Sequence, residues 1–151
     1  MALSFRAATE EDLPAIVGML ADDKLGQTRE RYADPLPGEY RRAFAAIMRQ
    51  EGNRLIVAVD GGAVAGCLQL TFIPGLSRMG MLRAQIESVR VDSGRRGRGV
   101  GEALIRHAIA LSREAGCGLA QLATDKSRPE ALRLYERLGF KATHEGMKLA
   151  L

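Results

Sequence analysis

Hydrophobic residues recur along the chain with two different spacings, which divide it into candidate strands and helices. Strict alternation over residues 3–7 predicts a short strand. Apolar positions at i, i+3, i+4 and i+7 over residues 13–20 predict an amphipathic helix. Asp12 would cap this helix, because Pro14 then falls in the first turn, where its missing N–H does no harm. Prolines and glycines interrupt residues 22–38, which we therefore expect to be irregular.

The middle of the chain is predicted to form one more helix and then antiparallel strands. The helix turns four apolar side chains inward, namely Tyr40, Phe44, Ile47 and Met48. Apolar runs at residues 55–59 and 63–72 predict two strands joined by the turn at residues 60–62. That turn reads Asp-Gly-Gly, and glycine supplies the positive φ that a tight hairpin needs. A further strand is expected at about residues 81–91.

The second half of the chain predicts alternating helices and strands. A helix follows a glycine- and arginine-rich loop and places five residues on one face: Val100, Leu104, Ala108, Leu111 and Ala115. Gly116 would end this helix, and residues 118–124 would form a strand. Pro129 at a first helical position would open the last helix, whose inner stripe is Ala131, Leu134, Tyr135 and Leu138. Gly139 would end it, and Phe140 onward would form one or two closing strands.

The predicted order of elements is β-α-α-β-β-β-α-β-α-β. Antiparallel hairpins come first and a β-α-β-α-β unit follows, so we expect an α/β (α+β) fold. Its mixed central sheet would have six to seven strands, with helices on both faces. The 151 residues contain no repeat or linker, and they predict a single domain, 1–151, with one substantial core.

Composition narrows the class of protein. The 46% hydrophobic and 26% charged content is that of an ordinary globular protein. No signal-like segment or membrane-length apolar run is present, so we expect a cytoplasmic protein without a membrane partner. Cys67 and Cys117 lack metal-ligand or redox spacing and the two histidines are isolated, so no metal is expected. The net charge of +4 suits an anionic ligand, and the position of the arginines decides which.

The loop at residues 92–101 has the properties of an anion site. It contains four glycines and three arginines, and a helix starts directly from it. The first N–H groups of a helix lack partners, glycines let the backbone close around phosphate oxygens, and arginines supply forked donors. The dinucleotide pattern G-x-G-x-x-G does not fit the spacing of these glycines, and the Gly-Lys-Ser/Thr of a nucleotide-hydrolase loop is missing.

The spacing that does fit is R/Q-x-x-G-x-G/A, met by Arg96-Gly97-Arg98-Gly99-Val100-Gly101. The strand at residues 86–91 precedes it, and the block at residues 131–140 matches A-x-x-x-Y-x-x-x-G-F. With these motifs the chain resembles the GNAT superfamily of N-acetyltransferases over nearly its whole length. The resemblance implies acetyl-CoA as co-substrate.

The resemblance also implies which residues bind this co-substrate. Backbone groups of Val89, Arg90 and Val91 would hold the pantetheine arm, as an added strand would. The pyrophosphate would be held by Arg96, Gly97, Arg98, Gly99, Val100, Gly101 and Glu102. Arg128 occupies a position where many relatives carry an asparagine that contacts the cofactor. It either reaches a phosphate or is a surface residue.

Two residues are candidates for catalysis. By period-two counting Glu87 shares a strand face with Val89 and Val91, an unusual place for a carboxylate. It reads as an exposed or ion-paired residue, and the resemblance implies a general base. Tyr135 lies on the inner stripe of the last helix, where core packing is the simple interpretation. The resemblance implies that it protonates the departing thiolate.

The expected function is transfer of an acetyl group from acetyl-CoA to a primary amine, by direct attack in a ternary complex. We expect a small-molecule acceptor. Acetylation of a protein or peptide amine and a catalytically silent coenzyme A-binding module are the alternatives. A nucleic-acid partner is not expected, because only 5% of residues are aromatic and none lies within the basic run. A homodimer is left open.

Overall fold

A five-stranded mixed sheet forms the centre of the computed structural model, which describes residues 1–151. The strands follow one another across the sheet in chain order, and the first four are antiparallel while β4 and β5 are parallel. Their bounds are Leu3–Ala7 (β1), Asn53–Asp60 (β2), Ala63–Ile73 (β3), Arg83–Val91 (β4) and Leu119–Leu122 (β5). The mixed sheet predicted from the sequence is therefore confirmed.

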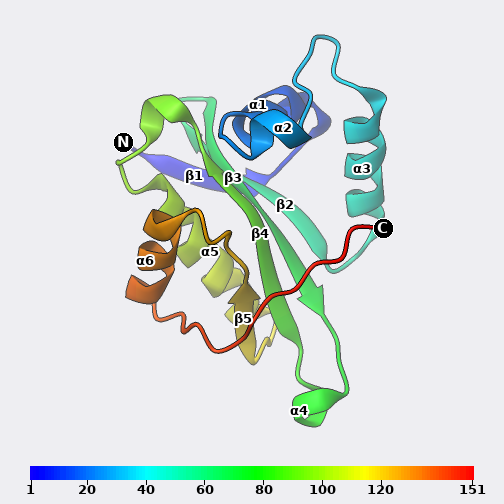
Figure 1. Cartoon of the computed structure of the whole chain (residues 1–151), viewed down its shortest axis with the longest axis vertical. Helices are drawn as coiled ribbons and strands as arrows, with labels where there is room; N and C mark the ends of the chain where they lie inside the picture. Colours follow the sequence, from blue (N-terminus) through cyan, green and yellow to red (C-terminus); the bar gives the residue numbers. More distant parts are fainter.

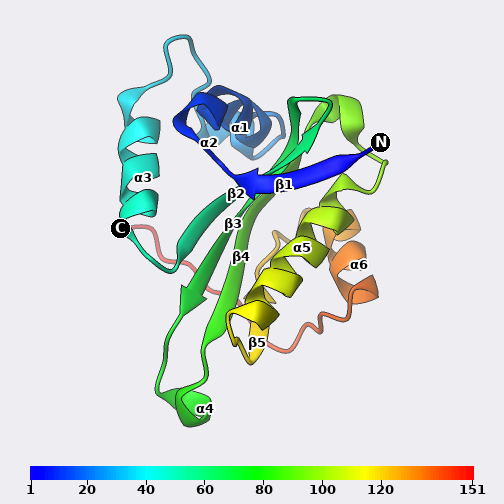
Figure 2. The same ribbon diagram turned by 180° about the vertical axis from the view of Figure 1, so that it is seen from behind.

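Helices cover both faces of this sheet (Figures 1 and 2). Residues of α1 and α3 pack on one face, and residues of α5 and α6 pack on the other. We call these the α1 face and the α5 face. The helices are α1 (Leu13–Ala21), α2 (Gly26–Arg29), α3 (Gly38–Arg49), α4 (Ser77–Gly80), α5 (Val100–Glu114) and α6 (Pro129–Arg137). Two 3-10 turns span Glu10–Asp12 and Ser93–Arg95.

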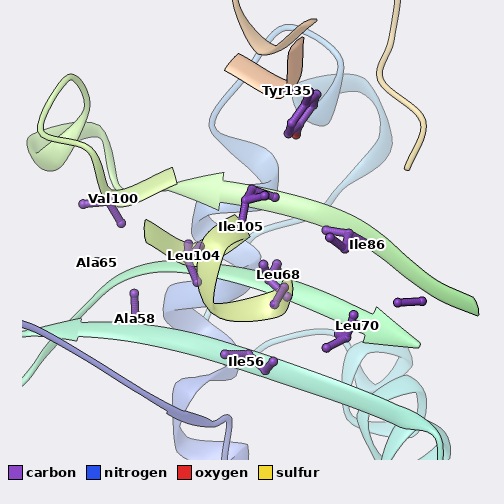
Figure 3. Packing of buried hydrophobic residues seen from close by; sticks show 12 residues of the cluster. Ile56, Ala58, Ala65, Leu68, Leu70, Ile86, Val100, Leu104, Ile105 and Tyr135 are labelled. Atoms are coloured by element: carbon purple, nitrogen blue, oxygen red, sulfur yellow. The ribbon is translucent and has the colours of Figure 1, made fainter. Parts of the chain in front are cut away.

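The two faces bury separate hydrophobic clusters. On the α5 face, Leu68, Ile86 and Leu104 are fully buried between the sheet and α5 (Figure 3). On the α1 face, Val17 and Val57 are buried in the same way. The helical and strand periodicities of the sequence predict that these apolar residues face the interior. Their burial therefore determines which face of each helix and strand is turned toward the core.

A β-bulge in β4 changes the face that each later residue presents. Gln69 of β3 pairs with Glu87, but Cys67 pairs with Arg90, so β4 has one extra residue. Ser88 within it has a left-handed φ of 54°. As a result Val89 and Val91 pack on the α5 face with Ile86, and Glu87 lies on the α1 face. The period-two expectation that Glu87 shares a face with Val89 and Val91 is wrong.

The closing strands expected after Phe140 are also absent. The sheet has five strands, not six or seven, and residues 141–151 are exposed coil. Three apolar side chains alternate near the end of this tail, Met147, Leu149 and Leu151, but each remains in solvent. Ordering a strand costs conformational entropy, and no burial of these side chains offsets that cost.

Two smaller expectations need correction. Asp12 precedes α1 but does not cap it with its side chain. Its carboxylate instead accepts hydrogen bonds from the Thr9 N–H at 2.8 Å and the Arg6 guanidinium at 2.7 and 2.9 Å. Met48 is 58% exposed, while Ile47 is partly buried, because neighbouring residues point about 100° apart around a helix.

Gly66 of β3 allows α5 to approach the sheet closely. A Cβ there would lie 2.8 Å from Leu104 Cδ1 and 2.8 Å from the Arg90 carbonyl oxygen. We expect Gly66→Ala to lower the free energy of unfolding by about 1–3 kcal/mol, the usual cost of overpacking. Gly146→Ala is the control, because a Cβ there meets nothing. Equal stability of both variants in urea titrations would contradict this packing.

Candidate active site

The candidate site lies where β4 and β5 separate. These strands pair only between Arg83–Ile86 and Leu119–Leu122, and β4 then continues to Val91 without a neighbour on that side. In Figure 1, β5 ends well before β4 does. The last five residues of β4 therefore present an open edge toward the gap, to which an extended ligand can hydrogen-bond as an added strand would. We call this opening the β4–β5 gap.

The glycine-rich loop follows β4 at one end of this gap. Asp92 begins it, and the Asp92 carboxylate accepts a hydrogen bond from the Gly94 N–H at 3.2 Å. The Arg95 guanidinium contacts Asp60 at 3.0 Å and Asp92 at 3.1 Å. Arg95 thus ties the loop to the end of the β2–β3 hairpin. Arg98 is exposed and makes no ion pair within the protein.

The turn into α5 has the backbone geometry of an anion site. Gly97 and Gly99 have left-handed φ values of 77° and 81°, and a Cβ on either would meet no atom within 4 Å. The backbone N–H groups from Gly97 to Glu102 have no acceptor within the protein. Unpaired N–H groups beside the positive end of a helix dipole are the arrangement that binds anions.

Asp23, in the connection between α1 and α2, joins two arginines beside the gap. Its carboxylate lies 2.7 Å from Arg128 and 3.5 Å from Arg90 Nε, and it also accepts the Gly26 N–H. Arg128 immediately precedes α6, and Arg90 lies on β4. Arg90 Nη1 donates to the Val89 carbonyl at 2.9 Å, while its buried Nε has no hydrogen-bond partner. The Asp23 contact to Nε is therefore a charge contact without hydrogen-bond geometry.

The neighbouring Asp22 makes a second contact from the same connection. Its carboxylate lies 3.3 Å from the guanidinium of Arg96, a loop residue 74 positions away. Sequence reasoning missed both aspartates, because residues 22–38 carry no periodic pattern and these partners are distant in the chain. No local signal could have found the pairs.

Tyr135 of α6 lies at the edge of the α5-face cluster. Its side chain is buried in this cluster (Figure 3). Its ring meets that of Phe140 edge-on, with the two ring centroids 5.9 Å apart. Burial raises the pKa of the phenol, and the nearby positive charges of Arg90 and Arg128 oppose that rise. The hydroxyl is therefore protonated at neutral pH. It makes no hydrogen bond within the protein, so it is free to donate one to a ligand.

Glu87 stands on the other side of β4. Its side chain is exposed on the α1 face and makes no ion pair or hydrogen bond within the protein. Tyr135 thus lies on the α5 face of β4, together with the side chains of Val89 and Val91, next to the gap. Glu87 lies on the same strand and faces the other way.

Other kinds of site find little support. No group of three or more His, Cys, Asp or Glu side chains is arranged to hold a metal ion. None of the helices combines the length and apolar character needed to cross a bilayer. Burial raises the pKa of the Cys67 thiol to about 12, more than the nearby Arg90 lowers it, so Cys67 is not a nucleophile at neutral pH.

The separated strands, the loop with unpaired N–H groups and the protonated tyrosine make up the candidate site, and the protein is an acetyltransferase that uses acetyl-CoA. The chain belongs to the acetyltransferase (GNAT) family, whose sequence model matches residues 17–140. The family resemblance predicted from the sequence is therefore confirmed.

Individual relatives cover almost the whole chain. A glucosamine 6-phosphate N-acetyltransferase from Trypanosoma brucei brucei is 33% identical, over 99% of this chain and 96% of its own. An aminoalkylphosphonate N-acetyltransferase from Salmonella typhimurium is 27% identical, over 92% and 85%. A transcriptional regulator from Bacillus halodurans C-125, whose crystal structure is known, is 53% identical in sequence. Its structure matches with a TM-score of 0.97, over 99% of this chain and 100% of its own.

Proposed function

We propose that this protein moves the acetyl group of acetyl-CoA to the primary amine of a small molecule, by direct attack in a ternary complex. The observation that carries the proposal is the open edge of β4, which runs from the gap beside Tyr135 to the loop with unpaired N–H groups. Two relatives are named for acetylation of small amines, glucosamine 6-phosphate and aminoalkylphosphonates, which supports a small acceptor.

In this proposal acetyl-CoA lies along the β4–β5 gap. Backbone groups of Val89, Arg90 and Val91 pair with the pantetheine arm, and the loop holds the pyrophosphate. Residues 96–102 supply the N–H groups and the exposed Arg98 guanidinium for this purpose. In this proposal Arg128 does not bind the pyrophosphate, because its guanidinium forms an ion pair with Asp23 and not with the loop.

The amine must lose a proton before it can attack. An alkyl ammonium with a pKa near 10.4 is only about one part in 10³ neutral at pH 7, a handicap of about 4–5 kcal/mol. Glu87 is the proposed base, acting directly or through water, because its carboxylate has no partner within the protein. A backbone N–H of the Val89–Val91 stretch steadies the oxyanion as the amine attacks the thioester carbonyl.

Tyr135 completes the transfer by protonating the departing thiolate. Its raised pKa keeps the phenol protonated, and its hydroxyl has no competing partner within the protein. The phenol lies near Arg90 and Arg128, whose positive charges would favour the tyrosinate that forms as the proton leaves. The new amide bond forms as the C–S bond breaks, and the proton of Tyr135 passes to sulfur. The proton that the attacking nitrogen loses returns through water to the tyrosinate, so the step balances.

Tyr135→Phe tests this role. The ring and its contact with Phe140 remain while the hydroxyl is lost, so we expect turnover to fall about 10- to 100-fold with little change in melting temperature. The lower end is expected, since a thiol with a pKa near 8.5 already leaves readily. Tyr32→Phe, at an exposed tyrosine, is the control. If turnover of Tyr135→Phe stays within about twofold of the parent, Tyr135 only packs the core.

The two alternative functions predict different results in the same assay. A silent coenzyme A-binding module would bind acetyl-CoA and release no thiol with any amine. A protein acetyltransferase would release thiol with peptides and not with small amines. Turnover with small primary amines excludes both.

A further inference from the structure

Three arginines from distant parts of the chain lie close enough for their charges to interact. Arg29 is the last residue of α2, Arg90 lies on β4, and Arg128 precedes α6. Burial is the main cause of the lowered pKa of Arg90, and the positive charges of Arg128 and Arg29 lower it further, while Asp23 opposes them. The same two arginines also act on the pKa of the Asp125 carboxylate. We call these three residues the arginine cluster.

The cluster has more cationic donors than the protein satisfies. Asp23 is the one carboxylate that forms ion pairs with it, to Arg128 at 2.7 Å and to Arg90 at 3.5 Å. Asp125 lies close, but its carboxylate accepts hydrogen bonds from the Ser127 N–H at 2.9 Å and hydroxyl at 2.7 Å. The buried Arg90 Nε has no acceptor at all. Three guanidinium groups share one ion-paired carboxylate, so the cluster keeps a net positive charge that favours an additional anion.

The cluster also lies on the side from which an acceptor would reach Glu87. The bulge at Ser88 places Arg90 and Glu87 on the same face, opposite Cys67 and Gln69 of β3. Their partners Gln69 and Cys67 are two positions apart on β3, a separation of about 7 Å, so an amine bound beside Glu87 would have the rest of its molecule near Arg90. Arg29 also borders a surface hollow of about 380 Å³ between α2 and α3, whose lining includes neither of the other two arginines nor Glu87.

We propose that Arg29, Arg90 and Arg128 bind an anionic tetrahedral group, phosphate or phosphonate, of the amine acceptor. This inference rests on the proposed acetyl transfer, whose acceptor it specifies. Guanidinium groups match such oxygens with paired N–H donors. The three positive charges of the arginines balance the one negative charge of Asp23 and the two of a dianionic phosphate or phosphonate. Asp23 holds Arg90 and Arg128 in position, and the anionic group of the acceptor balances the remaining positive charge of the cluster.

The test compares two amines that differ only in this group, 3-aminopropylphosphonate and its neutral diethyl ester. We expect the wild-type protein to prefer the phosphonate in kcat/KM. Arg29→Gln and Arg128→Gln should each lower kcat/KM for the phosphonate about 10- to 100-fold, the usual effect of losing a charged hydrogen bond. The ester and the KM for acetyl-CoA should change by less than about twofold. Arg113→Gln, at an exposed arginine of α5, is the matched control.

Two results would overturn the inference. Equal losses with both amines would mean that the arginines only support the fold, and Arg29→Gln addresses this directly because Arg29 is exposed. A raised KM for acetyl-CoA with unchanged preference between the amines would mean that they bind phosphates of coenzyme A instead.

Calorimetric titration of 3-aminopropylphosphonate without acetyl-CoA separates this inference from the proposed function. Binding that disappears in Arg29→Gln, in a protein that acetylates no amine, would support the anion site and reject acetyl transfer. Acetylation of the ester without any preference for the phosphonate would do the reverse.

Discussion

Replacing Gly99 with glutamate should abolish the stabilisation of this protein by acetyl-CoA. Gly99 caps the N-terminus of α5 in a left-handed conformation, φ 81°, beside N–H groups that have no acceptor. A glutamate there puts a side chain and a negative charge where the pyrophosphate would bind. Acetyl-CoA at about 100 times its Kd should stabilise the parent by about 2.7 kcal/mol, or roughly 5–10 °C in melting temperature. The variant should show no shift.

The matched control is Gly116→Glu at the other end of the same helix. Gly116 also has a left-handed φ, 85°, and a Cβ on it would likewise meet no atom within 4 Å. Both variants therefore carry similar backbone strain and the same change in charge. An undiminished shift in Gly99→Glu, or an equal loss in both variants, would show that the pyrophosphate does not bind at this loop.

Glu87→Gln should lower turnover about 100-fold or more near neutral pH, with little change in the affinity for acetyl-CoA. The defect arises because no base removes the proton from the acceptor ammonium. It should shrink as the pH rises toward the pKa of the amine, since the neutral amine then becomes abundant by itself. Rates measured from pH 7 to pH 10 would show the two profiles converging.

The control for Glu87 is Glu136→Gln, at an exposed glutamate of α6. It removes the same charge and should leave the pH profile unchanged. A defect in Glu87→Gln that stays constant across pH would contradict the role as base and indicate that Glu87 positions the acceptor.

Hydrophobic period and glycine positions were sufficient to predict most of the fold. The 3.6-residue period of residues 100–114 identified α5, and the glycines after helices do take left-handed conformations, as at Gly116 and Gly139. These signals are local, because each depends on residues within one or two turns of chain. The loop before α5 was predicted for the same reason, since its glycines and arginines are consecutive.

What the sequence could not reveal depends on contacts between distant segments. Period-two counting put Glu87 on the wrong face, because one extra residue at Ser88 reverses the alternation and leaves no local trace. The Asp23–Arg128 ion pair joins residues 105 positions apart. The closing strands expected after Phe140 are absent for the same reason, because residues 141–151 pair with no other strand in the sheet.

The most direct test of acetyl transfer follows both products of one reaction. The protein is mixed with acetyl-CoA and a panel of small primary amines, and free thiol and acetylated amine are measured over the same time course. We expect at least one amine to be acetylated in equal amount to the thiol released, with both lost in the Gly99→Glu variant. Thiol release without any acetylated amine, or no release with the whole panel, would contradict the proposed function.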